Sequence, residues 1–418
     1  MRSPTLPLAL YAAATGLLEP LAPALLERRA RVGKEDPERL HERLARPTAT
    51  RPEGPLVWLH GVSVGESLSL LPLIEALRTR PELNLLVTSG TVTSAKLLAQ
   101  RLPEGVIHQY APVDSPAAAA RFLDHWRPSA ALFVESELWP NLILAAKARG
   151  VRLALLSARM TEASARGWAR SPASARALLA AFDLVLPQDA DTRLRLERLG
   201  ARVGPSLNLK LAGPPPPVDA SLVAGLRKAI GDRKVILAAS THAGEEPPIA
   251  GAVPPGALLI VAPRHPDRGP QVATELAGSG FNVARRAAGE ALTAATTAYV
   301  ADTLGELGAL FTVAEVVVMG GSFVAGIGGH NPLEPARLGR VIVTGPHAFN
   351  AAEVYDEMFT EVAAIEAADV EALSRHLRGL LANPMIARRI GEAALSYANR
   401  QGAALDAAMA LLDPLLPA

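Results

Sequence analysis

Short runs of apolar, often β-branched residues recur along this 418-residue chain and alternate with longer stretches of helical spacing. Each run is too short for a buried helix and suits a strand that is covered on both faces of a parallel sheet. In the first half, strands are expected at 56–59, 83–87, 131–134, 152–156 and 184–186, and helices at 67–80, 92–102, 140–149, 173–182 and 190–199. This alternation predicts βαβ units and a doubly wound parallel sheet.

The same rhythm returns after a proline-rich stretch, Gly213-Pro-Pro-Pro-Pro217. Strands are expected at 234–238, 257–261, 298–300, 316–319 and 341–343, and helices at 219–230, 269–279, 369–382 and 385–415. Consecutive prolines form a stiff connector rather than a core element. The chain therefore predicts two Rossmann-like domains, 51–212 and 218–418, joined by a linker at 213–217 and facing a cleft. The last helix of the second domain can cross back to the first.

The amino-terminal 50 residues have a different character. Residues 3 to 18 carry no charge, the apolar stretch continues to Leu26, and an arginine-rich tract follows it. Because Glu19, Pro20 and Pro23 interrupt the stretch, a segment lying on a membrane surface is favoured over one that spans the bilayer. The excess of basic residues after the apolar stretch indicates the cytoplasmic face of an anionic membrane. A solvated helix that covers the first domain is the other alternative.

Composition and charge narrow the class of protein. A hydrophobic content of 49% with 20% charged residues describes a globular chain. The net charge of +1 gives no reason to expect a nucleic-acid partner. The sequence has no cysteine, which excludes disulfides and thiolate metal sites. The histidines show no metal-binding spacing, and Asp189-Ala-Asp191 is interpreted as the start of a helix, so no metal site is expected.

Ligands of parallel sheets bind at the carboxyl ends of strands, and polar residues gather there in the first domain. The loop His60-Gly-Val-Ser-Val-Gly-Glu66 lacks the G-x-G-x-x-G pattern, which disfavours a dinucleotide-dependent dehydrogenase. Ser63 and Glu66 match a capping box, yet the Glu66 carboxylate could also act as a general base, and both interpretations can hold. Glu135 and Glu137 follow the strand expected at 131–134 and suit hydrogen bonds to sugar hydroxyls, with helix capping as the alternative for Glu137.

The second domain carries a glycine-rich turn, from Gly320, Gly321 and Ser322 to Glu334, which leads from an apolar strand to a helix. Asn331 is expected as N-cap and Pro332 at the first helical position, so that N–H groups and the helix dipole would hold a phosphate. Further polar turns follow the other strands, at Ser240 and Thr241, at Arg264 and His265, and at 302–307. This edge suits a nucleotide, with Glu334 on the ribose hydroxyls.

Several of these motifs, in order along nearly the whole chain, resemble the 3-deoxy-D-manno-octulosonic acid (Kdo) transferases of lipopolysaccharide synthesis. The motifs are His60-Gly-Val-Ser-Val-Gly-Glu66, Glu135-Ser-Glu-Leu-Trp-Pro-Asn141, Ser240-Thr-His-Ala-Gly-Glu-Glu246, Pro263-Arg-His-Pro-Asp-Arg268, Ala301-Asp-Thr-Leu-Gly-Glu-Leu307 and Gly328-Gly-His-Asn-Pro-Leu-Glu-Pro335. The resemblance implies an α/β protein of the two-domain GT-B type. It also implies transfer of Kdo from CMP-Kdo to a lipid A precursor at the cytoplasmic face of the inner membrane, with no further cofactor.

The resemblance also implies roles for individual residues. Glu66 would accept the proton, and the acceptor or Kdo would contact Ser63, Gly65, Glu135, Glu137 and Arg159. The donor would contact Arg264, His265, Gly305, Glu306, Leu307, Asn331, Pro332, Leu333, Glu334, Ser240, Thr241, Gly320, Gly321, Ser322 and Lys210. Ser157 stands where the family has asparagine before Ala-Arg, and Leu211-Ala212 replace the family's Phe-Asp after Lys210.

Two other functions share parts of this pattern. A different GT-B enzyme, such as a UDP-sugar epimerase or a lipid A disaccharide synthase, would have the same fold and glycine turn. A non-catalytic lipid-binding protein would need only the apolar amino terminus and a cleft.

Overall fold

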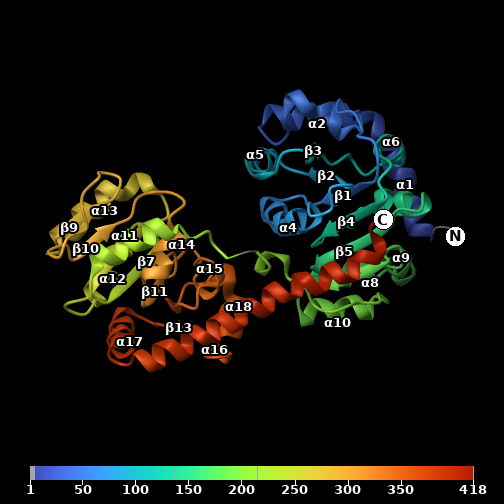
Figure 1. Ribbon diagram of the computed structural model, residues 1–418. Coiled ribbons are helices and arrows are strands. Elements are labelled where there is room, and N and C mark those ends of the chain that lie inside the picture. The colour runs from blue at the N-terminus through green and yellow to red at the C-terminus, as the bar shows by residue number, and fades with distance from the viewer. Residues whose placement is uncertain (1–4, 137, 214, 418) are drawn as a thin grey trace. The chain divides into compact units, whose positions relative to one another are not determined.

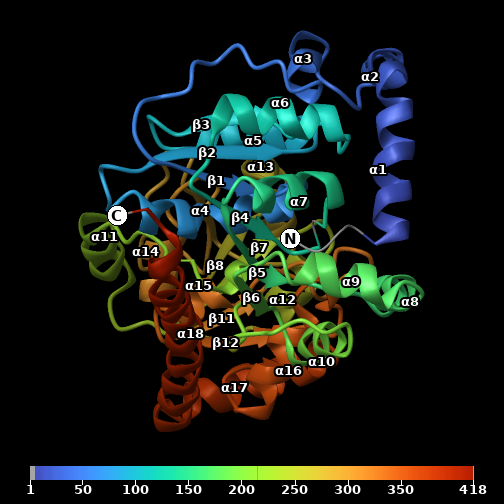
Figure 2. The same ribbon diagram turned by 90° about the vertical axis from the view of Figure 1, so that its right-hand side faces the viewer.

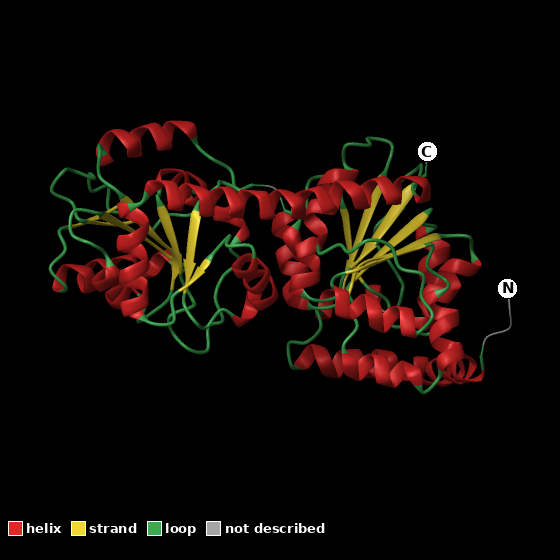
Figure 3. Cartoon of the chain, turned by 90° about the horizontal axis from the view of Figure 1, so that it is seen from below, coloured by secondary structure: helices red, strands yellow, loops and turns green. Residues whose placement is uncertain are grey.

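The computed structural model describes residues 5–136, 138–213 and 215–417. The chain divides into two compact units, which are called unit 1 and unit 2 below. Unit 1 comprises Met1–Gly213 and Gln401–Ala418, and unit 2 comprises Pro214–Arg400. Each unit contains a sheet with helices on both of its faces, as expected of an α/β protein (Figures 1 and 3).

The sheet of unit 1 is parallel and has six strands in the order β3-β2-β1-β4-β5-β6. The strands are β1 (Leu56–His60), β2 (Asn84–Ser89), β3 (Ile107–Tyr110), β4 (Ala130–Val134), β5 (Arg152–Ala158) and β6 (Leu184–Pro187). The order reverses between β1 and β4, which makes their carboxyl ends the switch point where doubly wound sheets bind ligands. Trp58 pairs with Ala131 in register across this point.

The helices of unit 1 cover this sheet on two sides. They are α4 (Val64–Leu77), α5 (Val92–Arg101), α6 (Pro116–Trp126), α7 (Pro140–Ala148), α8 (Glu162–Ala169), α9 (Pro172–Leu179) and α10 (Ala190–Arg198), followed by a 3-10 helix at Leu209–Leu211. Successive residues of β1 point to opposite faces, so that Trp58 packs in one buried cluster and Val57 and Leu59 in another. The second cluster also contains Leu412 and Leu416 from the carboxyl end of the chain.

The amino-terminal segment forms α1 (Leu6–Leu18), α2 (Ala22–Arg31) and α3 (Leu40–Arg43), with 3-10 turns at Glu19–Leu21 and Pro37–Arg39. Figure 2 shows α1 at the margin of unit 1. Polar side chains hold it there, because the Tyr11 hydroxyl donates to Asp114 at 2.9 Å and the Ser115 hydroxyl donates to Glu19 at 2.6 Å. Most of its large apolar side chains are exposed, including those of Leu6, Leu10 and Leu17.

The sheet of unit 2 is also parallel, with the strand order β13-β12-β11-β7-β8-β10-β9. The strands are β7 (Val235–Thr241), β8 (Leu258–Pro263), β9 (Val283–Arg285), β10 (Ala298–Val300), β11 (Val316–Met319), β12 (Val341–Thr344) and β13 (Ile365–Glu366). Its switch point lies between β7 and β11. The Ser240–Glu246 turn and the glycine turn therefore leave neighbouring strands at the same edge.

The helices of unit 2 are α11 (Ala220–Ile230), α12 (Glu246–Ala252), α13 (Gly269–Gly278), α14 (Leu307–Val313), α15 (Leu333–Ala336), α16 (Ala352–Thr360) and α17 (Val370–Ala382), with 3-10 turns at Pro266–Arg268 and Phe349–Ala351. A long helix, α18 (Pro384–Leu412), follows α17, and a 3-10 turn, Asp413–Leu415, ends it. The boundary between the two units falls inside α18, after Arg400.

The predicted α/β class and the parallel sheets are confirmed. The predicted strand regions are strands in the structure, and boundaries differ by a few residues; α4, for example, begins at Val64 rather than at 67 because Ser63 caps it. Several elements were not predicted. Among them, β3 contains His108 and Gln109, which break its apolar run, and α12 carries two prolines near its start. Short elements with polar or proline residues give little periodic signal.

Candidate active site

In unit 1 the loop after β1 turns directly into α4, and Glu66 lies in the first turn of that helix. Its carboxylate accepts hydrogen bonds from the backbone N–H groups of Val62 and Ser63, the latter at 3.1 Å, and the Ser63 hydroxyl accepts one from the Glu66 N–H at 3.3 Å. The predicted capping box is therefore present. The Glu66 side chain is mostly buried, and one of its two oxygens, Oε2, makes both of these bonds.

Glu135 follows β4 on the other side of the switch point, and its Oε1 lies 2.6 Å from Lys210 Nζ. Lys210 also approaches the loop of Glu66, since a Cβ added at Gly65 would lie 3.7 Å from Lys210 Cε. The structure thus brings Gly65, Glu66, Glu135 and Lys210 to one edge of one sheet. Glu137, which was grouped with them from the sequence, lies outside the described residues.

Backbone strain marks the same edge. Glu135 has a φ of 57° and Ser157, near the end of β5, has a φ of 49°, and this left-handed region is costly for residues other than glycine. The Glu135 carbonyl accepts the N–H of Arg159, and the Ser157 hydroxyl accepts the N–H of Leu209 at 3.3 Å. Ser157 therefore ties β5 to the 3-10 helix that carries Lys210. The Arg159 side chain is exposed.

The glycine turn of unit 2 differs from the phosphate cradle that the sequence suggested. The N–H of Gly320 bonds to the Ala239 carbonyl, and the N–H groups of Gly321 and Phe323 bond to the carboxylate of Glu245 at 2.7 and 2.9 Å. The Ser322 hydroxyl is also engaged, since it donates to the Met319 carbonyl and accepts the N–H of Gly345. The expectation that these groups face a phosphate is thus corrected, because a fully buried carboxylate already occupies the turn.

The helix expected to begin at Asn331 is also corrected. It is a single turn, Leu333–Ala336, with Pro332 at its N-cap, and the chain leaves the helix before the left-handed Gly339. Asn331 Oδ1 still accepts the N–H of Leu333 at 3.0 Å. A helix this short has only a small dipole. Glu334 is exposed, and desolvation by the protein around it raises its pKa while the charges of Arg337 and Arg264 act to lower it.

The cations after β8 divide into two groups. Arg264 and His265 are exposed and follow the strand directly, and their contact with the donor stays a prediction. Arg268 instead forms a two-pronged ion pair with the fully buried Glu246, at 2.8 and 3.2 Å. The Thr241 hydroxyl donates to the same carboxylate at 2.8 Å and is buried, so that Thr241 supports the turn from within. Ser240 beside it has a φ of 57°.

The turn after β10 is held by charges as well. Glu306 pairs with Arg286 and accepts the Thr303 hydroxyl, and the Arg286 guanidinium lowers the pKa of this carboxyl. Gly305 has a φ of 83°, which places Glu306 just before α14 and Leu307 at its first position. The side chain of Glu306 is therefore paired with Arg286, and a contact between the Gly305–Leu307 turn and the donor stays a prediction.

Three residues at this edge were not singled out from the sequence: Glu245, His242 and His330. Glu245 accepts the N–H of His242 as well as those of the glycine turn, so it joins the loops after β7 and β11. The two histidine rings lie side by side, with Nε2 atoms 3.0 Å apart. For Glu245 the sequence carries a signal, since two adjacent acids, Glu245-Glu246, follow a strand. For the two histidines it carries none, because they lie 88 residues apart.

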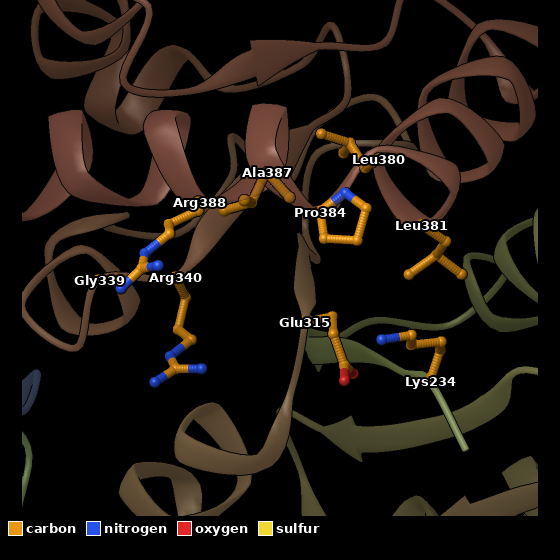
Figure 4. Close-up of a pocket in the computed structure, with 10 residues that line it drawn as sticks. Lys234, Glu315, Gly339, Arg340, Leu380, Leu381, Pro384, Ala387 and Arg388 are labelled. Carbon is orange, nitrogen blue, oxygen red and sulfur yellow. The ribbon is translucent and has the colours of Figure 1, made fainter. Parts of the chain in front are cut away.

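Two cavities in unit 2 lie away from these residues. One, of about 340 Å³, is lined by Lys234, Glu315, Arg340 and Arg388 together with apolar residues of α17 and α18 (Figure 4). It opens at the amino ends of β7, β11 and β12, the edge opposite to the switch-point turns. The other, of about 480 Å³, lies between α11 and Arg286. Ligands of doubly wound sheets bind at the carboxyl ends, so neither cavity is assigned to the reaction.

Possible metal ligands are spread out in the part of the chain that the structure describes. Within that part, no three side chains of His, Asp or Glu come together in a way that could hold a metal ion. Asp189, from the Asp189-Ala-Asp191 motif, accepts the N–H of Thr192 at 2.6 Å and caps α10. The motif is therefore the start of a helix, as predicted, with Asp189 rather than Asp191 as its N-cap.

Two doubly wound domains with polar turns at both switch points have the architecture of GT-B glycosyltransferases. A solved glycosyltransferase structure from Rickettsia africae shares this fold with a TM-score of 0.54 at 11% identity, covering 87% of this chain and 99% of that one. The predicted GT-B fold is therefore confirmed.

The particular family follows from sequence relatives. A family model described as 3-deoxy-D-manno-octulosonic-acid transferase (kdotransferase) matches residues 38–212. A probable 3-deoxy-D-manno-octulosonic acid transferase, mitochondrial, of Arabidopsis thaliana is 38% identical over 355 residues, which cover 81% of this chain and 79% of that one. A 3-deoxy-D-manno-octulosonic acid transferase of Rickettsia bellii is 30% identical and covers 98% of this chain and 99% of that one. The chain belongs to the Kdo transferase family and is a glycosyltransferase.

Proposed function

We propose that this enzyme transfers Kdo from CMP-Kdo to a lipid A precursor, lipid IVA, with inversion at the anomeric carbon. The observation that carries the proposal is the position of Glu66: a mostly buried carboxylate at a switch point, in a chain of the Kdo transferase family. One oxygen of Glu66 accepts the two loop N–H groups, which leaves Oε1 to take a proton. A positioned carboxylate of this kind suits general-base catalysis.

In the proposed reaction, Glu66 removes the proton from a glucosamine hydroxyl of the acceptor. The oxygen forms a bond to the anomeric carbon of Kdo from the face opposite to the phosphate, and the bond from that carbon to the phosphate oxygen breaks. A single displacement inverts the configuration. Glu135, held by Lys210, and the exposed Arg159 would contact the acceptor or the Kdo carboxylate. Ser63 and Gly65 shape the loop that holds Glu66.

The leaving CMP would be held by unit 2. The exposed Arg264 and His265 supply positive charge for the phosphate, and Glu334 supplies a carboxylate for the ribose hydroxyls. The backbone of Gly305 to Leu307 and the loop at Asn331 and Pro332 would complete the donor site. Arginine and histidine charges can stabilise the phosphate of the leaving group without a metal ion, so a metal-independent reaction that needs no further cofactor is proposed.

The amino-terminal helices would bring the enzyme to its lipid acceptor at the cytoplasmic face of the inner membrane. Residues 6–31 form a helical stretch long and apolar enough to cross a membrane, judged by length and composition alone. Tyr11 and Glu19 are hydrogen-bonded to residues 114 and 115 before α6, whereas Leu6, Leu10 and Leu17 are exposed. This arrangement favours a helix that lies in the membrane surface and keeps its polar side on the protein.

The test combines product analysis with one conservative variant. Incubation with CMP-Kdo and lipid IVA should give a product heavier by one or more Kdo residues in mass spectrometry, and NMR of the new glycosidic bond should show inversion. Glu66→Gln keeps a side chain that can complete the capping box, so the fold and CMP binding should survive while the transfer rate falls by about 10²–10⁴-fold.

The matched control is Glu75→Gln, an exposed glutamate on the same helix, which should retain full activity. A Glu66→Gln variant with most of its activity would contradict the base assignment. A donor panel separates the alternative functions: turnover of UDP-sugars in place of CMP-Kdo would identify another GT-B enzyme, and the absence of CMP release would favour a lipid-binding protein.

A further inference from the structure

His242 and His330 form a close pair at the switch point of unit 2. Their Nε2 atoms are 3.0 Å apart, their ring centroids 5.2 Å apart, and their ring planes differ by 15°. His242 follows β7 and His330 lies near the end of the glycine turn after β11, so two neighbouring strands place them together. Both rings are half-buried, and His265 meets His242 edge-on at 5.9 Å.

The contact between the two rings limits where their protons can lie. An Nε2–Nε2 separation of 3.0 Å fits one N–H···N hydrogen bond, so one ring carries its proton on Nε2 and the other ring accepts it. A neutral imidazole has a single N–H, so Nδ1 of the donating ring carries no proton. An additional proton would therefore go to that Nδ1.

The charges around the pair are mostly positive. Arg264, Arg268 and His265 face His242, and Arg264 also acts on His330. Glu245 is the one acid that acts on His242, and its oxygens are already bonded to three backbone N–H groups. Burial, together with these cations, lowers the pKa of His330 to about 4 and also lowers that of His242. At neutral pH the pair is uncharged.

We propose that the His242–His330 pair takes up one proton when a phosphate monoester dianion occupies the donor site. The pair thus gains one positive charge when the phosphate of the leaving nucleotide gains one negative charge. This inference rests on the proposed function. CMP-Kdo is a phosphodiester with one negative charge on its phosphate. When the bond between the anomeric carbon and the phosphate oxygen breaks, the electron pair stays on that oxygen and CMP becomes a monoester, whose second pKa is about 6.

The phosphate thus gains one negative charge during the step. An anion close to the pair cancels the field of Arg264 and its neighbours and favours the charged form of an imidazole. A proton from the buffered solution then binds to Nδ1 of the ring that donates in the pair, and the cation is shared through the Nε2–Nε2 contact. The proton of the acceptor hydroxyl goes separately to Glu66. The pair would bind the product CMP more tightly than a nucleotide diester and stabilise the developing charge.

Calorimetry of CMP binding to the full chain tests this proposal. Titrations at pH 7 in buffers of different ionisation enthalpy report the number of protons taken up for each CMP bound. The wild type should take up roughly half a proton or more. His242→Gln and His330→Gln should each lose most of this uptake, whereas His376→Gln, on α17, should keep it. Cytidine, which has no phosphate, should bind the wild type without proton uptake.

The possible outcomes distinguish a failure of the proposed function from a failure of the proposed role of the His242–His330 pair. A chain that does not bind CMP contradicts the proposed function itself. CMP binding without proton uptake, or uptake that persists in both pair variants, overturns the role of the pair and leaves the proposed function standing. Proton uptake that is lost in His265→Gln but kept in both pair variants also overturns the role of the pair. Loss confined to the two pair variants supports the proposal.

Discussion

At the scale of single residues, individual carboxylates fix the loops that form the candidate sites. Glu66 caps α4 and is also the proposed base, and Glu245 joins the loops that follow β7 and β11. Glu334 differs because it is exposed at the edge that we propose as the donor site, where desolvation nevertheless raises its pKa. An acid with a raised pKa loses its charge at a higher pH than an ordinary glutamate does.

This property predicts a pH dependence for nucleoside binding. If the Glu334 carboxylate accepts the ribose hydroxyls, the affinity for cytidine should fall on acidification, beginning above the ordinary glutamate pKa of about 4.3. Glu334→Gln should bind cytidine about 10–100-fold more weakly and lack this part of the pH dependence, because a charged acceptor contributes about 1.5–3 kcal/mol. Calorimetry with cytidine avoids titration of the phosphate. Unchanged affinity in the variant would remove Glu334 from the site.

His60 in unit 1 predicts a second pH effect, on folding. Burial lowers its pKa to about 3, so the unfolded chain binds a proton at His60 below pH 6.5 while the folded chain stays neutral. Unfolding is therefore favoured as the pH falls, and this residue should cost about 2 kcal/mol of the free energy of unfolding between pH 7 and pH 5.

Tryptophan fluorescence in urea measures this effect in unit 1 alone, because all four tryptophans belong to that unit. His60→Gln loses a hydrogen bond to Thr88 and should be less stable at pH 7, but its stability should change less on acidification. His376→Gln, in unit 2, should behave like the wild type. An equal loss between pH 7 and pH 5 in wild type and His60→Gln would contradict the assignment.

At the scale of elements, the glycine turn after β11 acts as a scaffold. A Cβ at Gly320 would lie 2.6 Å from the Ser240 carbonyl oxygen and 2.7 Å from Thr241 Cα, both backbone atoms of the neighbouring strand. The strands can approach this closely only because the residue is glycine. Glu245 then fills the space inside the turn where an external anion was expected.

Gly320→Ala should therefore destabilise unit 2 by about 1–3 kcal/mol and weaken CMP binding, because the added methyl group must push β7 and β11 apart. Gly379→Ala is the matched control. It lies in the interior of α17 with open space around its Cα, and should stabilise the helix by about 0.5–1 kcal/mol. Circular dichroism melts compare the two. A neutral Gly320→Ala variant would show that the turn tolerates movement.

The elements were predictable to different degrees. Long apolar strands such as β1 and β11, and capped helices such as α4, carry their signal within a few adjacent residues, and the switch points follow from their order. The direction of individual side chains was not predictable. Whether Thr241 faces a ligand or Glu246, and whether the N–H of Gly321 is taken by Glu245, depends on partners that the fold brings close. The His242–His330 pair required the register of β7 against β11.

At the scale of the whole molecule, the amino-terminal helices present their leucines outward. Leu10 and Leu17 are 60% and 82% exposed, and α2 continues with Arg28, Arg29 and Arg31. Apolar side chains next to arginines predict binding to anionic lipid that weakens with salt. The sequence pattern could suggest this role, but it could not show that Tyr11 and Glu19 are hydrogen-bonded to Asp114 and Ser115.

The double variant Leu10→Ser with Leu17→Ser should lose most of its cosedimentation with vesicles that contain anionic phospholipid, since each leucine contributes about 1.5–3 kcal/mol when buried. Leu304→Ser changes an equally exposed leucine in unit 2 and should leave vesicle binding intact. If the wild type resists extraction from membranes with alkaline carbonate, the helix spans the bilayer instead. Vesicle binding that is unchanged in the double variant would exclude α1 as the contact.

The helix α18 has a consequence for the order in which the chain can fold during synthesis. Ala408, Leu412, Leu415 and Leu416 complete a buried cluster that contains Leu70 and Leu73 of α4, the helix of Glu66. A ribosome releases these last residues only after it has made the whole of unit 2. The first unit to be synthesised is therefore the last to close its core, and an apolar face of its α4 stays uncovered until residues 408–416 have left the ribosome.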